Sequence, residues 1–211
     1  MRKTCTTRDL RKYFVHKGRT MRQASREVSP SLIRQRDRAH HQVLSSIALS
    51  TKGLRPKRIL DIGTGYGMNL TFLACRFGKS SRIWSVDASP GVVREVKKMM
   101  RAHEYSRHII VRKANSQELP FKNDRFDLIV SMFLIHHLSS PTRGLSEMGR
   151  VLSQGGKLII ADWKPTAAKP LKLHKQSEIP SPTFVINQLK RLGYSTKIRI
   201  GRYWYLIEAS K

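Results

Sequence analysis

The chain has 211 residues, of which 39% are hydrophobic, and its 41 Lys and Arg against 14 Asp and Glu give a formal net charge of +27. The length suits one α/β domain with an appendage, and the hydrophobic content excludes wholesale disorder. The apolar runs are far shorter than the roughly 20 residues that span a bilayer, and we expect no secretory signal at the N-terminus.

The cysteines and the N-terminus bear on the compartment. Cys5 and Cys75 have no metal-ligand spacing, so the sequence predicts free thiols, no metal site and a cytoplasmic location. The first thirty residues are rich in Arg and poor in acid, which is also typical of a mitochondrial transit peptide or of a disordered basic tail.

Residues 1–54 are predicted to form a basic extension that contains helices. The segment 8–18 has the pattern of a short helix, and a longer one should begin at Pro30 with Ser29 as its cap and end before Gly53. The remaining residues, 55–211, are predicted to form a single domain, which is large enough to carry an active site.

Strands and helices alternate from residue 58 onward. Short apolar strands that alternate with helices indicate a parallel sheet covered on both faces. The expected strands are 58–62, 82–87, 108–114, 126–132 and 156–163, and the expected helices are 67–78, 89–103 and 140–153.

The last fifty residues break this alternation. A loop rich in Pro and Lys is expected at 164–182, followed by a helix at 181–193. Two strands, 194–200 and 202–209, are separated by Gly201 alone and predict a hairpin. The final strand should therefore run antiparallel to the others.

The stretch "RILDIGTGYGMNL" places three glycines at alternate positions, Gly63, Gly65 and Gly67, directly after the first strand. Ligands of such sheets bind at the carboxyl ends of the strands, and glycines let the backbone approach them. Met68 stands where a dinucleotide fingerprint needs its third glycine. Asp87 ends the second strand, where a carboxylate suits the hydroxyls of a ribose. The pattern predicts a ligand with a ribose but no pyrophosphate.

Several segments resemble the motifs of class I S-adenosylmethionine-dependent methyltransferases. They are "LDIGTGYG", "VDAS", "ANSQELPFKNDRFDLIVSMFLIHHL" and "RVLSQGGKLIIADW", and together they cover roughly residues 55–163. The most similar branch holds quinone-biosynthesis C-methyltransferases and tRNA wobble-uridine methyltransferases. The resemblance implies a Rossmann-like, seven-stranded, mostly parallel sheet with one antiparallel strand in a C-terminal hairpin, helices on both faces, and S-adenosyl-L-methionine as cofactor.

The resemblance also implies roles for single residues. Asp61, Gly63 and Gly65 would line the methionine end of the cofactor. Asp87 would bind the ribose, Asn115 with Ser116 would face the adenine, and Ser131 would lie beside the sulfonium. The family usually has aspartate at the position of Asn115, and an amide is a weaker acceptor than a carboxylate. The full predicted cofactor site is Asp61, Gly63, Gly65, Gly67, Asp87, Ala88, Asn115, Ser116 and Ser131.

His136 and His137 are the candidate catalytic residues. An imidazole titrates near neutral pH, so either histidine could act as a general base or contact the substrate. Either could equally be a residue at the start of a helix with no chemical role. Taken alone, each glycine or aspartate of the predicted cofactor site could also have a purely structural role, as a turn residue or a helix cap.

The favoured function is methyl transfer to RNA, either tRNA or rRNA, because it accounts for both the motifs and the charge. Tyr13, Phe14, Tyr203 and Trp204 lie among basic residues and could stack on unpaired bases, although Tyr203 and Trp204 could instead pack the hairpin. The alternatives are a quinone-type small molecule, a protein in a ribonucleoprotein or chromatin particle, and a nonenzymatic RNA-binding protein. A small activating subunit stays open as a further partner.

Overall fold

The computed structural model describes residues 29–173 and 175–211. The predicted short helix at 8–18, with Tyr13 and Phe14, lies outside the described residues, as does Cys5. The predictions for residues 1–28 therefore stay predictions.

Seven strands of the described chain form a single sheet in the order β3-β2-β1-β4-β5-β7-β6. Strand β7 runs antiparallel to both of its neighbours, β5 and β6, and the other pairs are parallel. This order confirms the predicted mixed sheet with one antiparallel strand. The strands are β1 (Arg58–Ile62), β2 (Arg82–Asp87), β3 (Ile109–Lys113), β4 (Phe126–Met132), β5 (Leu152–Trp163), β6 (Ser195–Ile200) and β7 (Trp204–Ser210).

Ser-Pro pairs start four of the helices. In each pair the serine hydroxyl accepts a hydrogen bond from the backbone N–H three residues later, and the proline takes the first helical position. Proline is favoured there because its missing N–H would have no partner inside the helix. The helices are α3 (Pro30–Ser50), α4 (Met68–Phe77), α5 (Pro90–Arg101), α6 (Pro141–Val151) and α7 (Pro182–Arg191).

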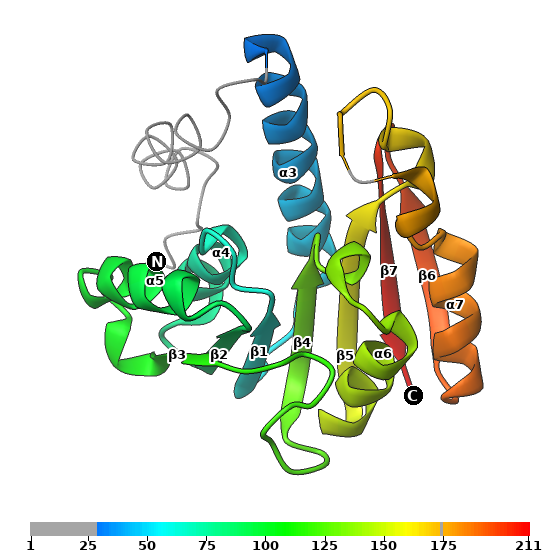
Figure 1. Cartoon of the computed structure of the whole chain (residues 1–211). Helices are drawn as coiled ribbons and strands as arrows, with labels where there is room; N and C mark the ends of the chain where they lie inside the picture. The colour runs from blue at the N-terminus through cyan, green and yellow to red at the C-terminus, as the bar shows by residue number, and fades with distance from the viewer. Residues whose placement is uncertain (1–28, 174) are drawn as a thin grey trace.

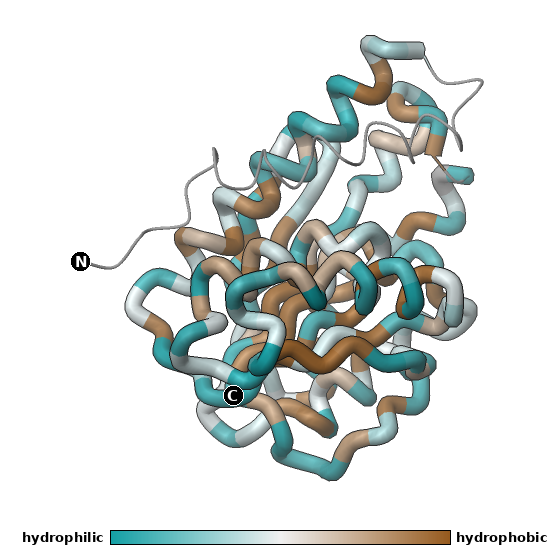
Figure 2. Tube along the Cα trace, turned by 90° about the vertical axis from the view of Figure 1, so that its left-hand side faces the viewer, coloured by the Kyte–Doolittle hydropathy of each residue, from teal (hydrophilic) through white to brown (hydrophobic). Residues whose placement is uncertain are grey.

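Helices cover both faces of the sheet, as the sequence predicts. Buried side chains of α3, α4 and α5 pack in one apolar core with one face, and those of α6 and α7 pack in a second core with the other face. Figure 2 shows the most hydrophobic chain concentrated in the middle of the molecule, where the strands run. The result is a three-layer α/β/α arrangement.

Helix α3, which the sequence assigns to the N-terminal extension, packs into the same core as the sheet. Its side chains Leu32, Val43, Leu44 and Ile47 are buried, and the helix contacts β5 and β7. Figure 1 shows that its first turns extend past the carboxyl ends of β4 and β5. The helix therefore stands over the edge of the sheet where a ligand is expected.

The segment between β5 and α7 is more ordered than a Pro- and Lys-rich loop would suggest. It contains two short 3-10 turns, Pro165–Ala167 and Gln176–Glu178. Leu171 and Ile179 are buried against the core that includes α3. We call residues 164–173 and 175–180 the covering segment.

The C-terminal hairpin differs slightly from the prediction. The second strand begins at Trp204 rather than at residue 202, because Gly201, Arg202 and Tyr203 form the turn, and the N–H of Gly201 donates to the carbonyl of Trp204. In the described part of the chain, none of the helices combines the length and apolar character that crossing a membrane requires.

Candidate active site

The loop after β1 depends on its three glycines. Gly63, Gly65 and Gly67 have φ values of +83°, +47° and +75°, which side chains rarely allow. A Cβ on Gly67 would also lie 2.6 Å from a methyl of Met99, whereas one on Gly65 would meet only a backbone oxygen 3.9 Å away. Gly67 is therefore required mainly by its backbone conformation, because the flexible end of Met99 could move aside, and Gly65 borders open space.

Asp61 lies beneath this loop. Its carboxylate is fully buried and accepts hydrogen bonds from Asn69 Nδ2 at 2.7 Å and Ser85 Oγ at 2.6 Å. The hydroxyl of Thr64 lies 2.6 Å from that of Ser85, which extends the network into the loop. Burial raises the pKa of Asp61 to about 7. Asp61 thus supports the loop from below and does not line the cavity described next.

A cavity of about 920 Å³ lies at the carboxyl ends of the strands. Most of the predicted site residues line it, and Asp61, Gly67 and Ser131 do not. The Oγ of Ser131 is buried at the end of β4 without a hydrogen-bond partner among the described residues. The predicted residues that the cavity brings together are Gly63, Gly65, Asp87, Ala88, Asn115, Ser116, His136 and His137.

Polar groups line one part of this cavity. One oxygen of Asp87 accepts from the N–H of Gly65 at 3.0 Å, and the other accepts from the N–H of Ser89 at 2.9 Å. Each carboxylate oxygen can accept a further bond. Asn115 Oδ1 accepts from the N–H of Gln117 at 2.9 Å, which leaves its amide nitrogen as the donor. This part can hold a ligand that carries hydroxyl and ring-nitrogen groups.

A buried His–Asp pair lies in the next part of the cavity wall. His136 Nδ1 lies 2.5 Å from Asp162 Oδ1, and the two side chains are 3% and 0% exposed. The second carboxylate oxygen accepts from the backbone N–H of His136 at 3.1 Å, and the N–H of Trp163 also donates to Asp162. Because the carboxylate of Asp162 accepts a hydrogen bond from the Nδ1–H of His136, the nitrogen of this ring that can accept a proton is Nε2.

The sequence analysis missed Asp162. The sequence did contain a signal for it, because Asp162 is an acidic residue near the end of an apolar strand. In the structure that strand lies beside β4, and Ala161, the residue before Asp162, pairs with Met132 of β4. Adjacent carboxyl ends of parallel strands bring such residues together. His137, in contrast, is exposed, and its ring lies 4.0 Å from that of His136.

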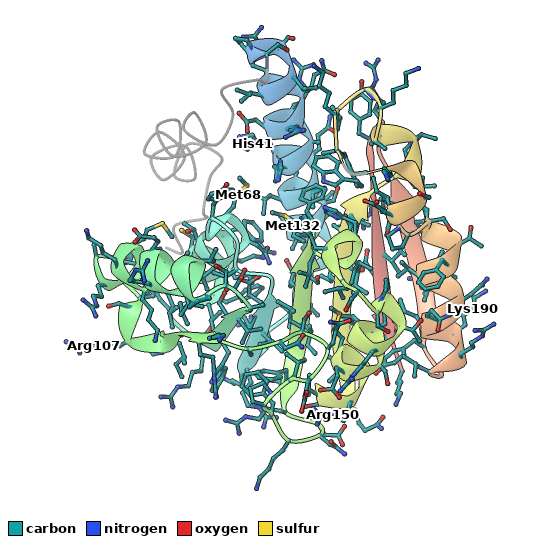
Figure 3. All side chains as sticks on the ribbon, viewed as in Figure 1. His41, Met68, Arg107, Met132, Arg150 and Lys190 are labelled. Atoms are coloured by element: carbon teal, nitrogen blue, oxygen red, sulfur yellow. The ribbon has the colours of Figure 1, made fainter. Side chains whose placement is uncertain are left out.

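The remaining wall of the cavity is largely apolar. It includes Met68, Met132, Phe133, Leu138 and Trp163. Figure 3 shows Met68 and Met132 beside helix α3.

Helix α3 and the covering segment border this part of the cavity. The guanidinium of Arg36 donates to the carbonyls of Leu171, at 2.5 and 3.1 Å, and Lys172, at 2.7 Å. Arg36, His40, Lys172 and Leu173 all line the cavity. The cavity thus combines a polar part at the glycine loop with a part under the helix where apolar and aromatic side chains lie beside Arg36, His40 and Lys172.

The aromatic residues of the hairpin do not border this cavity. Trp204 is 7% exposed and donates from Nε1 to Gln42 Oε1 at 3.0 Å, and the Tyr203 hydroxyl donates to Gln35 Oε1 at 3.2 Å. Both therefore pack the hairpin against α3. The burial of Trp204 removes it from the residues that could stack on a base.

Comparison with known proteins gives the family. Residues 60–160 match the methyltransferase domain family. The ubiquinone/menaquinone biosynthesis C-methyltransferase UbiE of Geotalea daltonii is 35% identical over 50% of this chain and 45% of its own length. The demethylmenaquinone methyltransferase of Bacteroides fragilis is 31% identical over 57% of this chain and 49% of its own length. The chain thus spans about half the length of these curated relatives.

A solved structure extends the likeness to nearly the whole fold. A S-adenosylmethionine-dependent methyltransferase from Aquifex aeolicus superposes with a TM-score of 0.69 and 25% identity, over 87% of this chain and 98% of that one. The matched domain, the strand order of the sheet and the glycine loop after β1 all point to the same kind of protein. Residues 60–160 are therefore a methyltransferase domain, and the chain has the fold of the S-adenosylmethionine-dependent methyltransferases.

Proposed function

We propose that the protein transfers a methyl group from S-adenosylmethionine to a small molecule of the quinol type, an acceptor with an ionisable ring hydroxyl. The observation that carries the proposal is the buried His136–Asp162 pair in the wall of a partly open cavity whose lining is more apolar than polar. The names of the curated relatives support the same acceptor class.

The described residues fit the cofactor. Asn69 lines the cavity, and its buried Oδ1 has no hydrogen-bond partner among the described residues, so it suits a donor such as the ammonium group of the cofactor. Gly65 leaves open space above the loop, and Asp87 can accept from two ribose hydroxyls. When bound, S-adenosylmethionine supplies a methyl group that its sulfonium already activates.

His136 would act as the general base. Its Nε2 would take the proton of the acceptor hydroxyl, and the negative charge of Asp162 would stabilise the imidazolium that forms. An ionised ring hydroxyl increases the electron density of the neighbouring ring carbons, which makes them better nucleophiles. The apolar walls of the compartment would exclude water from this reaction.

RNA remains the second candidate acceptor. The net charge of +27 favours it, because each Lys or Arg that neutralises a phosphate releases a counterion. The apolar share of the cavity lining and the names of the curated relatives argue for a small acceptor instead.

The test compares three variants of the full chain with a quinol acceptor. His136→Ala should lower turnover by roughly 10²–10⁴-fold at unchanged cofactor affinity, because the base is lost. Asp162→Asn should also lower turnover, since it removes the charge that orients and stabilises the ring. His137→Ala is the matched control and should change turnover far less, because that ring is exposed. Full activity of His136→Ala would refute the assigned base.

A further inference from the structure

Phe133, the first residue after β4, has an unusual backbone. Its φ is +56°, a left-handed conformation that is rare for a residue with a large side chain. Its N–H donates to the carbonyl of Ala161 on β5 at 2.8 Å, so the conformation is fixed by a defined contact. Residues held in this region cost free energy and cluster at functional sites. The position of the ring indicates what this conformation achieves.

The ring of Phe133 joins two other aromatic rings at the wall of the cavity. It stacks on Trp163, with ring centroids 4.0 Å apart and planes inclined by 22°, and lies 4.5 Å from the ring of His40. The three rings come from α3, the end of β4 and the end of β5, and all three residues line the cavity. Trp163 is 4% exposed, whereas Phe133 and His40 are half-buried. Phe133 and His40 are therefore the rings that a ligand can reach.

The rings are fixed from two sides. The Nδ1 of His40 donates to the carbonyl of Arg36 at 2.7 Å, and the side chain of Arg36 holds the covering segment. Trp163 follows Asp162 directly, and Phe133 precedes His136 by three residues. The aromatic cluster and the His–Asp pair are thus built on the same two strand ends.

We propose that Phe133 and His40, backed by Trp163, form an aromatic shelf that stacks the planar ring of the acceptor beside His136. The proposal rests on the proposed function. In it, the shelf binds acceptors with an aromatic ring more tightly than acceptors with a saturated ring. Flat rings stack on aromatic side chains in offset or edge-to-face arrangements, and this geometry adds to the binding that area burial gives. Aliphatic walls such as those of Leu138 and Leu173 would not distinguish the two kinds of ring.

The experiment measures binding without methyl transfer. The full chain is titrated by calorimetry, without cofactor and under reducing conditions, with 1,4-dihydroxynaphthalene as the aromatic probe and decahydronaphthalene-1,4-diol as its saturated counterpart. Phe133→Gly removes the ring and relieves the left-handed backbone, and it should raise the dissociation constant of the aromatic probe about 3- to 10-fold. Phe133→Tyr keeps a ring and should retain the wild-type value. His40→Leu should weaken the aromatic probe as well, which covers the case of a misfolded Phe133 variant.

The control is Tyr203→Leu, which removes a ring that packs near α3 but does not line the cavity, and it should leave both probes unaffected. Equal binding of 1,4-dihydroxynaphthalene by the wild type, Phe133→Gly and His40→Leu would overturn the shelf, as would equal binding of the two probes by the wild type. Binding that depends on the shelf without any methylation of quinols would leave the shelf standing and remove the proposed function. Methylation of quinols together with an unchanged dissociation constant of the aromatic probe in Phe133→Gly would support the proposed function and overturn the shelf.

Discussion

Three aspartates lie at or near the carboxyl ends of strands β1, β2 and β5, and each has a different environment. Asp61 on β1 is fully buried beneath the glycine loop, and Asp87 on β2 faces the polar compartment. Asp162, near the end of β5, is buried against the ring of His136. The same side chain thus supports a loop, offers hydrogen bonds to a ligand, or orients a base, depending on its neighbours.

Asp87 offers the most direct test of cofactor binding. Asp87→Ala removes a charged acceptor for two ribose hydroxyls, and hydrogen bonds to charged groups are worth about 1.5–3 kcal/mol each. We expect roughly a 10-fold or greater loss of S-adenosylmethionine affinity in calorimetry. Asp124→Asn is a suitable control, because asparagine tolerates the φ of +52° at this position and Asp124 lies near the opposite ends of the strands, where its N–H donates to the carbonyl of Arg150. Wild-type affinity in a folded Asp87→Ala protein would contradict the site.

Asp61 makes stability depend on pH. Burial raises its pKa to about 7 in the folded protein, against 3.8 for an exposed aspartate. The folded state therefore binds this proton more tightly than the unfolded state, and the free energy of unfolding should fall as the pH rises from about 4 to about 7. The fall attributable to this group is up to about 4 kcal/mol. Denaturant unfolding between pH 5 and 8 should show a shallower slope for Asp61→Asn, and an identical slope would refute the assignment.

The residues of the site were predictable from the sequence to different degrees. Gly63, Gly65 and Asp87 line the cavity as expected, because a strand followed by glycines fixes a local turn. Asp61 was expected at the cavity, yet its partners Asn69 and Ser85 hold it below the loop. Asp162 lies 26 residues from His136, and the contact depends on the pairing of β4 with β5.

At the scale of elements, helix α3 and the covering segment form one unit with the cavity. The serine cap and the apolar spacing of α3 are visible in the sequence, and the structure confirms both. The covering segment reads as a loop because Pro and Lys dominate it. Its order comes from contacts with distant residues, such as the burial of Leu171 against the core and the bonds from Arg36. Local composition carries no sign of such contacts.

Arg36 is expected to hold the covering segment closed. Arg36→Ala removes the hydrogen bonds to the carbonyls of Leu171 and Lys172, so the segment should open more often and expose the cavity to water. Amide hydrogen exchange should rise in residues 169–173, and the KM for a small acceptor should increase while cofactor affinity stays unchanged. Arg34→Ala, at an exposed position of the same helix, is the matched control. Equal exchange in both variants would show that Arg36 does not hold the segment.

The whole molecule combines a partly apolar cavity with a strongly basic composition. Apolar side chains gather inside, and many of the 41 Lys and Arg lie on the outside, such as Arg107 and Lys190 in Figure 3. Charge of this size attracts polyanions at long range whatever the substrate, and that attraction weakens steeply with salt. The charge therefore indicates that the protein can associate with polyanions, whereas the cavity indicates which acceptors it can methylate.

The most direct measurement follows the methyl label. The full chain is incubated with S-adenosylmethionine labelled in the methyl group and a cell extract, which is then divided by extraction into organic solvent, nuclease digestion and protease digestion. We predict that the label enters the solvent-extractable fraction and that His136→Ala abolishes most of this transfer. Label that stays in the aqueous phase and is released by nuclease would contradict the small-molecule acceptor and establish RNA in its place.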